Sequence, residues 1–388
     1  MIKALIVIGT RPEAIKMAPV VKELQRYAEE FNCVVCSTGQ HRRILNQVLS
    51  MFGIVPDHDL DIMRPGQDLY DISSGVLLGL RQVLAEERPD YVLVHGDTTT
   101  SVAAAMAAYF ARVPVIHVEA GLRTYDPLSP WPEEINRQII SRIATHHFAP
   151  TQTACENLIK ENVDASIVTV TGNTGIDALR WICDSVGGNT VRQAYFADMI
   201  RNAGYDLDRI SAGRRLILVT GHRRENFGSG LRSVCRALKR IASHYSDVDI
   251  LYPMHPNPNV RQAIADEFGD NSVLDGLSVF FIEPLEYPAF ILAMYRASIV
   301  ITDSGGIQEE APALGKPVLV TRETTERTEA VSAGTVRLVG TDCDRIVSAA
   351  RRLLDDSEEY ASMASAVNPY GDGEAASRIV ETLRKISQ

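Results

Sequence analysis

Short apolar runs rich in Val, Ile and Leu alternate with longer amphipathic stretches along almost the whole chain. Apolar runs that are continuous, with no polar residue at every second position, are typical of strands buried on both faces, which occur in parallel sheets covered by helices. The amphipathic stretches supply the helical crossovers that parallel strands require. The alternation therefore predicts an α/β protein made of doubly wound parallel sheets.

The runs form two series, and 388 residues are more than one hydrophobic core usually serves. We expect an N-terminal domain over residues 1–172 and a second domain over residues 173–367, with the boundary near Gly172-Asn173-Thr174. Turn-forming residues at 368–373 precede a last amphipathic helix over residues 375–386, so segment 368–388 is expected to pack back on the first domain. The strands are expected at residues 3–8, 33–38, 91–95, 114–119 and 166–171, then at 215–220, 250–254, 279–282, 298–302, 317–320 and 335–338.

Composition narrows the classes of partner. The formal net charge of -10 argues against nucleic acid, which requires an excess of Lys and Arg, but one pocket for a small anion needs only a few local cations. No stretch holds the roughly 18 apolar residues that a membrane span needs, and the start of the chain lacks a signal-peptide cleavage site. We expect a cytoplasmic protein, and the six scattered cysteines are expected to be reduced.

Polar residues follow the apolar runs, where ligands of open parallel sheets bind. The first run ends in Gly9-Thr10-Arg11-Pro12-Glu13, a glycine turn into a helix. The helix start could bind an anion with Arg11 and Lys16 as neighbours. An ordinary helix cap with a surface arginine explains the same residues equally well.

Two neighbouring runs end in carboxylates. Asp97 follows one run and Glu119 the next, and a pair in one crevice would suit acid/base catalysis. Asp97 alone is more often a helix cap, whereas Glu is a poor cap and is harder to explain structurally. Glu133, after two prolines, is a candidate base that could equally stabilise the helix dipole. His95 and His117 are expected to be structural.

The second series carries groups suited to a nucleotide. His222 stands between Gly221 and two arginines after the first strand of the series, where imidazole and guanidinium groups could bind a diphosphate and stabilise a leaving phosphate. Ser304-Gly305-Gly306 joins another strand to a helix, so its N–H groups could hold phosphate. Glu310, one turn further, could accept both ribose hydroxyls. Arg327 lies in a charged stretch that is either a solvated surface or a cleft closure.

Markers of common cofactors are missing. The first run is not followed by the Gly-x-Gly-x-x-Gly pattern of dinucleotide folds, and no Walker A motif or zinc-ligand spacing occurs. We therefore expect no cofactor and no metal.

Taken in order, these motifs resemble the non-hydrolysing bacterial UDP-N-acetylglucosamine 2-epimerases, and the similarity spans essentially the whole chain. The resemblance implies a glycosyltransferase-B-like fold of two Rossmann-type domains with a deep cleft, and a homodimer. It also implies interconversion of UDP-N-acetylglucosamine and UDP-N-acetylmannosamine by elimination of UDP, through a 2-acetamidoglucal, and re-addition. The matching segments are 9–13, 95–99, 117–123, 130–134, 221–225, 303–306 and 368–373.

The resemblance also assigns roles to single residues. Asp97, Glu119 and Glu133 become the acid/base candidates, with Lys16 and Arg137 in support. Glu310 would bind the ribose, Phe290 would pack on uracil, and Arg327 would lie nearby. The diphosphate would be held by Arg11, His222, Ser304, Gly305 and Gly306, with His222 also counted as catalytic.

Four alternatives remain open at this stage. The enzyme could act on a modified UDP-sugar, such as a diacetamido uronic acid derivative, or release free N-acetylmannosamine by hydrolysis. It could also be a UDP-sugar-dependent glycosyltransferase. The last alternative is a non-catalytic nucleotide-sugar sensor, against which the intact set of carboxylates argues.

Overall fold

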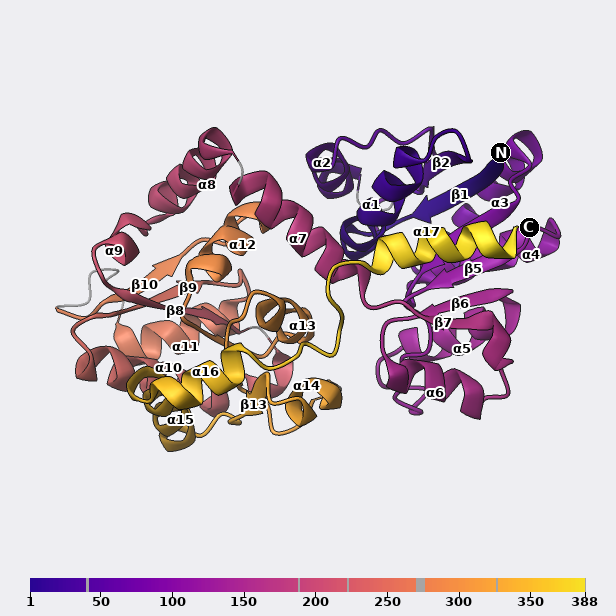
Figure 1. Ribbon diagram of the computed structural model, residues 1–388. Coiled ribbons are helices and arrows are strands. Elements are labelled where there is room, and N and C mark those ends of the chain that lie inside the picture. Colours follow the sequence, from indigo (N-terminus) through magenta and orange to yellow (C-terminus); the bar gives the residue numbers. More distant parts are fainter. Residues whose placement is uncertain (40–41, 188, 222, 270–275, 326, 388) are drawn as a thin grey trace. The chain divides into compact units, whose positions relative to one another are not determined.

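The structure, a computed structural model, describes residues 1–39, 42–187, 189–221, 223–269, 276–325 and 327–387. Contacts divide the chain into two compact units (Figure 1). Unit 1 comprises residues 1–178 and 370–388, and unit 2 comprises residues 179–369. The predicted limit at residue 172 falls just before helix α7 (Thr174–Gly187), through which the chain leaves unit 1.

Unit 1 is built on a seven-stranded parallel sheet with the strand order β3-β2-β1-β4-β5-β6-β7. Alternate residues of the central strands, such as Leu5 and Val7, pack against one layer of helices that contains α3, α4 and α5. Helices α1 and α17 pack against one another. The strands are β1 (Ile2–Ile8), β2 (Phe31–Ser37), β3 (His58–Asp59), β4 (Tyr91–His95), β5 (Val115–Val118), β6 (His146–Ala149) and β7 (Val168–Val170). The helices are α1 (Arg11–Arg26), α2 (Arg42–Met51), α3 (Leu69–Glu87), α4 (Thr99–Phe110), α5 (Glu133–Ile143), α6 (Gln152–Lys160) and α17 (Ala375–Ile386).

Unit 2 repeats the plan with a six-stranded parallel sheet in the order β10-β9-β8-β11-β12-β13. Its core joins alternate strand residues such as Ile217 and Val219 to helices α10, α11 and α15. The strands are β8 (Arg215–Thr220), β9 (Val248–Pro253), β10 (Val279–Ile282), β11 (Ile299–Thr302), β12 (Val318–Val320) and β13 (Val336–Leu338). The helices are α8 (Thr190–Ala203), α9 (Asp208–Ser211), α10 (Ser229–His244), α11 (Pro258–Phe268), α12 (Tyr287–Arg296), α13 (Gly305–Ala313), α14 (Thr328–Ser332), α15 (Cys343–Asp355) and α16 (Ser357–Ala364).

The α/β class with parallel sheets, predicted from the sequence, is confirmed. Two strands of unit 1 were not predicted. Strand β3 has only two residues. Strand β6 begins with His146 and His147, so its sequence does not show an apolar run, although both imidazoles are buried. Among the described residues, no helix is both long and apolar enough to cross a membrane.

Candidate active site

Glu13 ties the ends of two strands together in unit 1. Thr10 caps helix α1, and the Glu13 carboxylate accepts hydrogen bonds from the backbone N–H groups of Gly9 (2.8 Å) and Thr10 (2.6 Å). Its other oxygen accepts hydrogen bonds from the hydroxyls of Thr98 (2.5 Å) and Ser101 (2.8 Å), beyond the end of β4. Sequence reasoning missed this buried residue, although Thr10-x-x-Glu13 is the pattern of a capping box.

Arg11 is exposed at the first position of helix α1, directly after the Thr10 cap. The loop that leads to it is tight. A Cβ atom on Gly9 would lie 2.3 Å from the Thr100 hydroxyl oxygen, so only glycine fits between β1 and α4. The close approach of Gly9 to α4 therefore fixes the backbone at the start of α1.

Glu119 lies directly after β5 in the left-handed region of the backbone, with φ of 59°. Its carboxylate forms an ion pair with Lys16 of α1, and the Nε2 atom of His95 lies 3.6 Å from the same oxygen. Burial raises the pKa of Glu119, but the charge of Lys16 and the neighbouring His95 lower it more, so the pKa is held well below its usual value. Glu119 is therefore a carboxylate at neutral pH.

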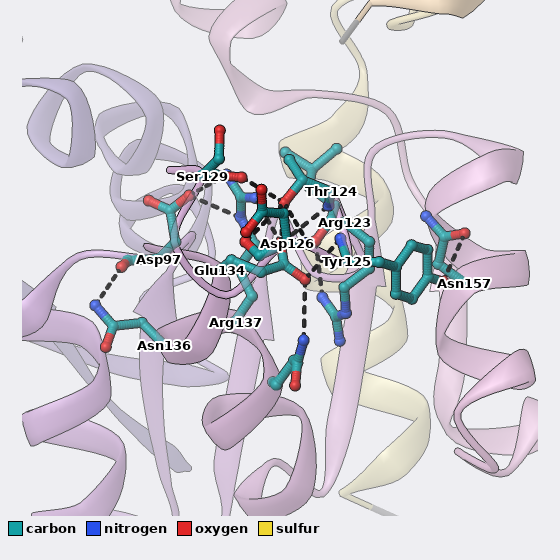
Figure 2. Close-up of polar contacts among 12 residues, drawn as sticks. Asp97, Arg123, Thr124, Tyr125, Asp126, Ser129, Glu134, Asn136, Arg137 and Asn157 are labelled. Atoms are coloured by element: carbon teal, nitrogen blue, oxygen red, sulfur yellow. Dashed lines mark hydrogen bonds and ion pairs between the residues drawn. The ribbon is translucent and has the colours of Figure 1, made fainter. Parts of the chain in front are cut away.

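Asp97 follows β4 and is held by Arg137 of α5 (Figure 2). The guanidinium of Arg137 donates to the Asp97 carboxylate from Nε at 2.9 Å and from Nη2 at 2.6 Å. The side-chain amide of Asn136 donates to the Asp97 backbone carbonyl at 2.8 Å. A Cβ atom on Gly96 would lie 3.7 Å from the Glu119 carboxylate, so Glu119 extends over the residue before Asp97.

Glu134 organises the loop between β5 and α5. This fully buried carboxylate accepts hydrogen bonds from the N–H groups of Thr124 (3.0 Å) and Tyr125 (3.3 Å) and from Arg137 (3.2 Å), as Figure 2 shows. Burial raises the pKa of Glu134, but the hydrogen bonds from Thr124 and Gln138 and the charge of Arg137 lower it by more. The pKa of Glu134 is therefore below its usual value. Glu134 thus holds the same arginine that binds Asp97.

Glu133, the predicted base, starts helix α5 next to Glu134. Its Oε2 atom is buried and has no hydrogen-bond partner among the described residues. Glu133 and Arg137 are four residues apart on α5 and share one side of the helix. The carboxylate of Glu133 therefore lies on the side of α5 that carries the cation bound to Asp97.

Four histidines of this sheet, His95, His117, His146 and His147, are buried, whereas His58 of β3 is half-buried. His117 lies 2.8 Å from the Gly96 carbonyl oxygen through Nε2. Burial, together with neighbouring His147, lowers the pKa of His117 to about 3, and burial with the charge of His146 lowers that of His147 to about 4. Both imidazoles are neutral at physiological pH.

In unit 2, strands β8 and β11 end side by side. The Thr220 and Thr302 hydroxyl oxygens lie 2.6 Å apart, and the Thr302 hydroxyl accepts a hydrogen bond from the Ser304 N–H at 2.9 Å. Buried Asp303 accepts hydrogen bonds from the N–H of Arg223 (2.9 Å) and the amide of Asn226 (3.3 Å). These bonds shape the loop after Thr220. The predicted residue His222 belongs to this loop and lies outside the described residues.

Helix α13 starts with Gly305 and Gly306, and Arg327 lies over this start. The Arg327 guanidinium donates to the Glu309 carboxylate at 2.9 Å, and a Cβ atom on Gly305 would lie only 3.1 Å from its Cζ atom. Ser304 occupies the N-cap position but makes no side-chain capping bond among the described residues. A helix start with glycines, a hydroxyl and a nearby guanidinium suits a phosphate.

A cavity of about 250 Å³ adjoins this helix start. Phe290 of α12 and Ser304 and Ile307 line it, together with the loop around Met254 and His255. Glu310 accepts a hydrogen bond from the Tyr287 hydroxyl at 2.9 Å. The predicted residues Phe290 and Ser304 thus line one cavity, and Glu310 lies one turn after Ile307 on α13. Tyr287 and Met254 were not predicted from the sequence.

Four predicted residues of unit 1 are paired by the structure, Lys16 with Glu119 and Arg137 with Asp97. No group of three or more His, Cys, Asp or Glu residues suited to a metal occurs in the part of the chain that the structure describes.

Comparison with known proteins identifies the family. The UDP-N-acetylglucosamine 2-epimerase family model matches residues 22–384. The UDP-N-acetylglucosamine 2-epimerase of Escherichia coli K12 is 53% identical over 383 residues, which cover 98% of each chain. A crystal structure of UDP-GlcNAc 2-epimerase from Neisseria meningitidis bound to UDP-GlcNAc has a TM-score of 0.85 at 46% identity, covering 99% of this chain and 100% of the other.

A more distant enzyme, from Methanocaldococcus jannaschii in complex with UDP-GlcNAc and UDP, has a TM-score of 0.76 at 30% identity and covers 99% of this chain and 100% of that one. Both structures share the two-domain, glycosyltransferase-B-like α/β architecture predicted from the sequence. The resemblance seen in the motifs is confirmed over the full chain, and this protein belongs to the UDP-N-acetylglucosamine 2-epimerase family.

Proposed function

We propose that this protein interconverts UDP-N-acetylglucosamine and UDP-N-acetylmannosamine without an added cofactor. The observation that carries the proposal is the pair of cation-held carboxylates at neighbouring strand ends, Glu119 with Lys16 and Asp97 with Arg137. Inverting a carbon that bears hydrogen requires groups that remove a proton and return one, and positioned carboxylates serve both tasks. Relatives of the same family are named for this reaction.

Unit 2 is proposed to hold the UDP group. Phe290 would stack on uracil in the cavity, and Glu310 would accept the ribose hydroxyls. The start of α13, with Ser304, Gly305 and Gly306, would hold the diphosphate with Arg327 beside it. Arg11 and His222 are also proposed to bind the diphosphate, His222 by analogy with the family motif. The Neisseria and Methanocaldococcus relatives, which were solved with UDP-GlcNAc bound, support this assignment of ligand.

The proposed reaction has two halves. A carboxylate takes the proton from carbon 2 of the sugar, the electron pair forms a double bond to carbon 1, and the bond from carbon 1 to the diphosphate oxygen breaks. UDP leaves with the electron pair of the broken carbon 1–oxygen bond, and its charge is stabilised by arginine, imidazole and helix N–H groups. A proton then returns to the other face of carbon 2 while the diphosphate oxygen re-forms the bond to carbon 1. Asp97, Glu119 and Glu133 are proposed to share the proton transfers.

The direct test is to incubate the purified protein with UDP-N-acetylglucosamine alone and to follow the products by NMR. UDP-N-acetylmannosamine should accumulate to a constant ratio, from either starting sugar. Release of free N-acetylmannosamine and UDP as the only products would indicate a hydrolysing enzyme and overturn the proposal. A protein that binds UDP but converts neither sugar would instead be a sensor.

We also propose that the protein is a homodimer that associates through helices α4 and α5. Large apolar side chains are exposed there, among them Tyr109 (62%) and Phe110 (63%) on α4, with Ile135 and Ile139 on the adjacent helix. Exposed apolar patches mark interaction sites. Sedimentation velocity should show a dimer, and the double variant Tyr109→Ser, Phe110→Ser should be a monomer. Tyr195→Ser, at an equally exposed tyrosine of α8, serves as the control.

A further inference from the structure

One hydrogen bond joins helices α12 and α13 beside the cavity of unit 2. The Tyr287 hydroxyl donates to the Glu310 Oε1 atom at 2.9 Å. Tyr287 and Phe290 are three residues apart on α12, as are Ile307 and Glu310 on α13, so each pair shares one side of its helix. Phe290 and Ile307 line the cavity. Tyr287 and Glu310 each lie about one helical turn from a residue that lines the cavity, so the bond between them is near the cavity.

The chemistry of this contact suits a ribose. A carboxylate has about four lone-pair sites, and the tyrosine occupies one of them on Oε1. Two neighbouring hydroxyls can donate to one carboxylate, which can accept more than one hydrogen bond. A free glutamate side chain is flexible, and fixing its rotamer costs free energy that a bound ligand would otherwise have to supply. A hydroxyl that already orients the carboxylate removes part of this cost.

We propose that Tyr287 is a positioning residue for ribose recognition, acting through Glu310. The inference rests on the proposed function, in which Glu310 binds the ribose of UDP. It adds that the preference for a ribose over a deoxyribose depends on the Tyr287 hydroxyl. A purely structural link between two helices would have no such effect on ligand discrimination.

The test measures discrimination by isothermal titration calorimetry with UDP and with 2′,3′-dideoxy-UDP. Tyr287→Phe keeps the ring and removes the hydroxyl, and we expect it to bind UDP about tenfold more weakly while binding the dideoxy analogue as the unmodified protein does. Glu310→Gln should lose the same preference, and the double variant should be no weaker than Glu310→Gln alone. Tyr295→Phe, at an exposed tyrosine of the same helix, is the matched control and should bind both ligands normally.

The outcomes distinguish a failure of the role proposed for Tyr287 from a failure of the proposed function. If the unmodified protein prefers UDP but Tyr287→Phe keeps the full preference, or weakens both ligands equally, the role of Tyr287 is overturned and the proposed function stands. If the unmodified protein fails to bind UDP, or binds both ligands equally, the assignment of UDP and Glu310 fails first, and the inference fails with it. A thermal melt of Tyr287→Phe close to that of the control shows that the variant is folded.

Discussion

At the ends of β4 and β5, unit 1 gathers carboxylates held by cations, whereas at the ends of β8 and β11 unit 2 offers hydroxyls, glycines and backbone N–H groups. Asp97 and Glu119 each have a basic partner in Arg137 and Lys16. The start of α13 instead has two glycines with Arg327 over them. The same sheet edge is thus proposed to serve proton transfer in one unit and anion binding in the other, because the residues after each strand differ.

The difference also extends to how each site is supported. In unit 1 a second set of buried carboxylates, Glu13 and Glu134, fixes the loops through backbone N–H groups and hydroxyls. In unit 2 the loops are fixed by Thr302 and by Asp303. Around the start of α13, Asp303 accepts hydrogen bonds within its loop and Glu309 binds Arg327.

The largest effect should come from neutralising the carboxylates of unit 1. Glu119→Gln and Asp97→Asn should lower kcat by about 10² to 10⁴, because each removes a proposed acid or base, while UDP affinity stays near normal. Measuring kcat and calorimetric UDP binding on the same proteins separates the two functions. Glu156→Gln, at an exposed residue of α6, is the control. Near-normal turnover in both variants would remove these carboxylates from the mechanism.

A second effect should be the greater sensitivity of unit 1 to acid. The pKa values of buried His117 and His147 are lowered from 6.5 to about 3 and about 4, so below about pH 6.5 the unfolded chain binds more protons than the folded one. Stability should therefore fall as the pH drops. Asp177 acts oppositely, because burial raises its pKa from 3.8 to about 6 and it favours the folded state as the pH falls through this range.

The net loss of unfolding free energy between pH 7 and pH 5 should be about 2 kcal/mol. The two described histidines of unit 2, His244 and His255, are exposed. Hydrogen exchange should therefore accelerate in β5 and β6 at a higher pH than in β8 and β11. Equal acceleration in both sheets, or first in unit 2, would contradict this difference between the units.

A smaller effect is expected from a single methyl group at the proposed phosphate site. Gly305→Ala places a Cβ atom 3.1 Å from Arg327 Cζ, so the guanidinium must move away from the helix start. UDP affinity should fall about tenfold, the size of one hydrogen bond to a charged group. Gly306→Ala meets no atom within 4 Å of the added carbon and should weaken UDP binding less. Equal losses in calorimetry would show that the placement of Arg327 is unimportant.

The sequence predicted what depends on local patterns. Continuous apolar runs predicted the parallel sheets, and the polar residues after them placed Asp97 and Glu119 at one sheet edge. Strand β6 was not predicted because its two histidines are polar residues. Their burial depends on contacts with neighbouring strands. The bond from Tyr287 to Glu310 could not be predicted either, because it depends on how α12 and α13 pack. Glu13 could have been recognised from its capping-box spacing.

We propose that carboxylates of unit 1 exchange the proton on carbon 2 of the sugar while unit 2 holds UDP. The most direct test is to run the reaction in deuterated water, starting from UDP-N-acetylglucosamine, and to examine the product by NMR and mass spectrometry. We expect one deuterium at carbon 2 of every UDP-N-acetylmannosamine formed, and no deuterium incorporation by the Glu119→Gln, Asp97→Asn double variant. Epimerised product that retains the original hydrogen at carbon 2 would contradict proton transfer through these carboxylates.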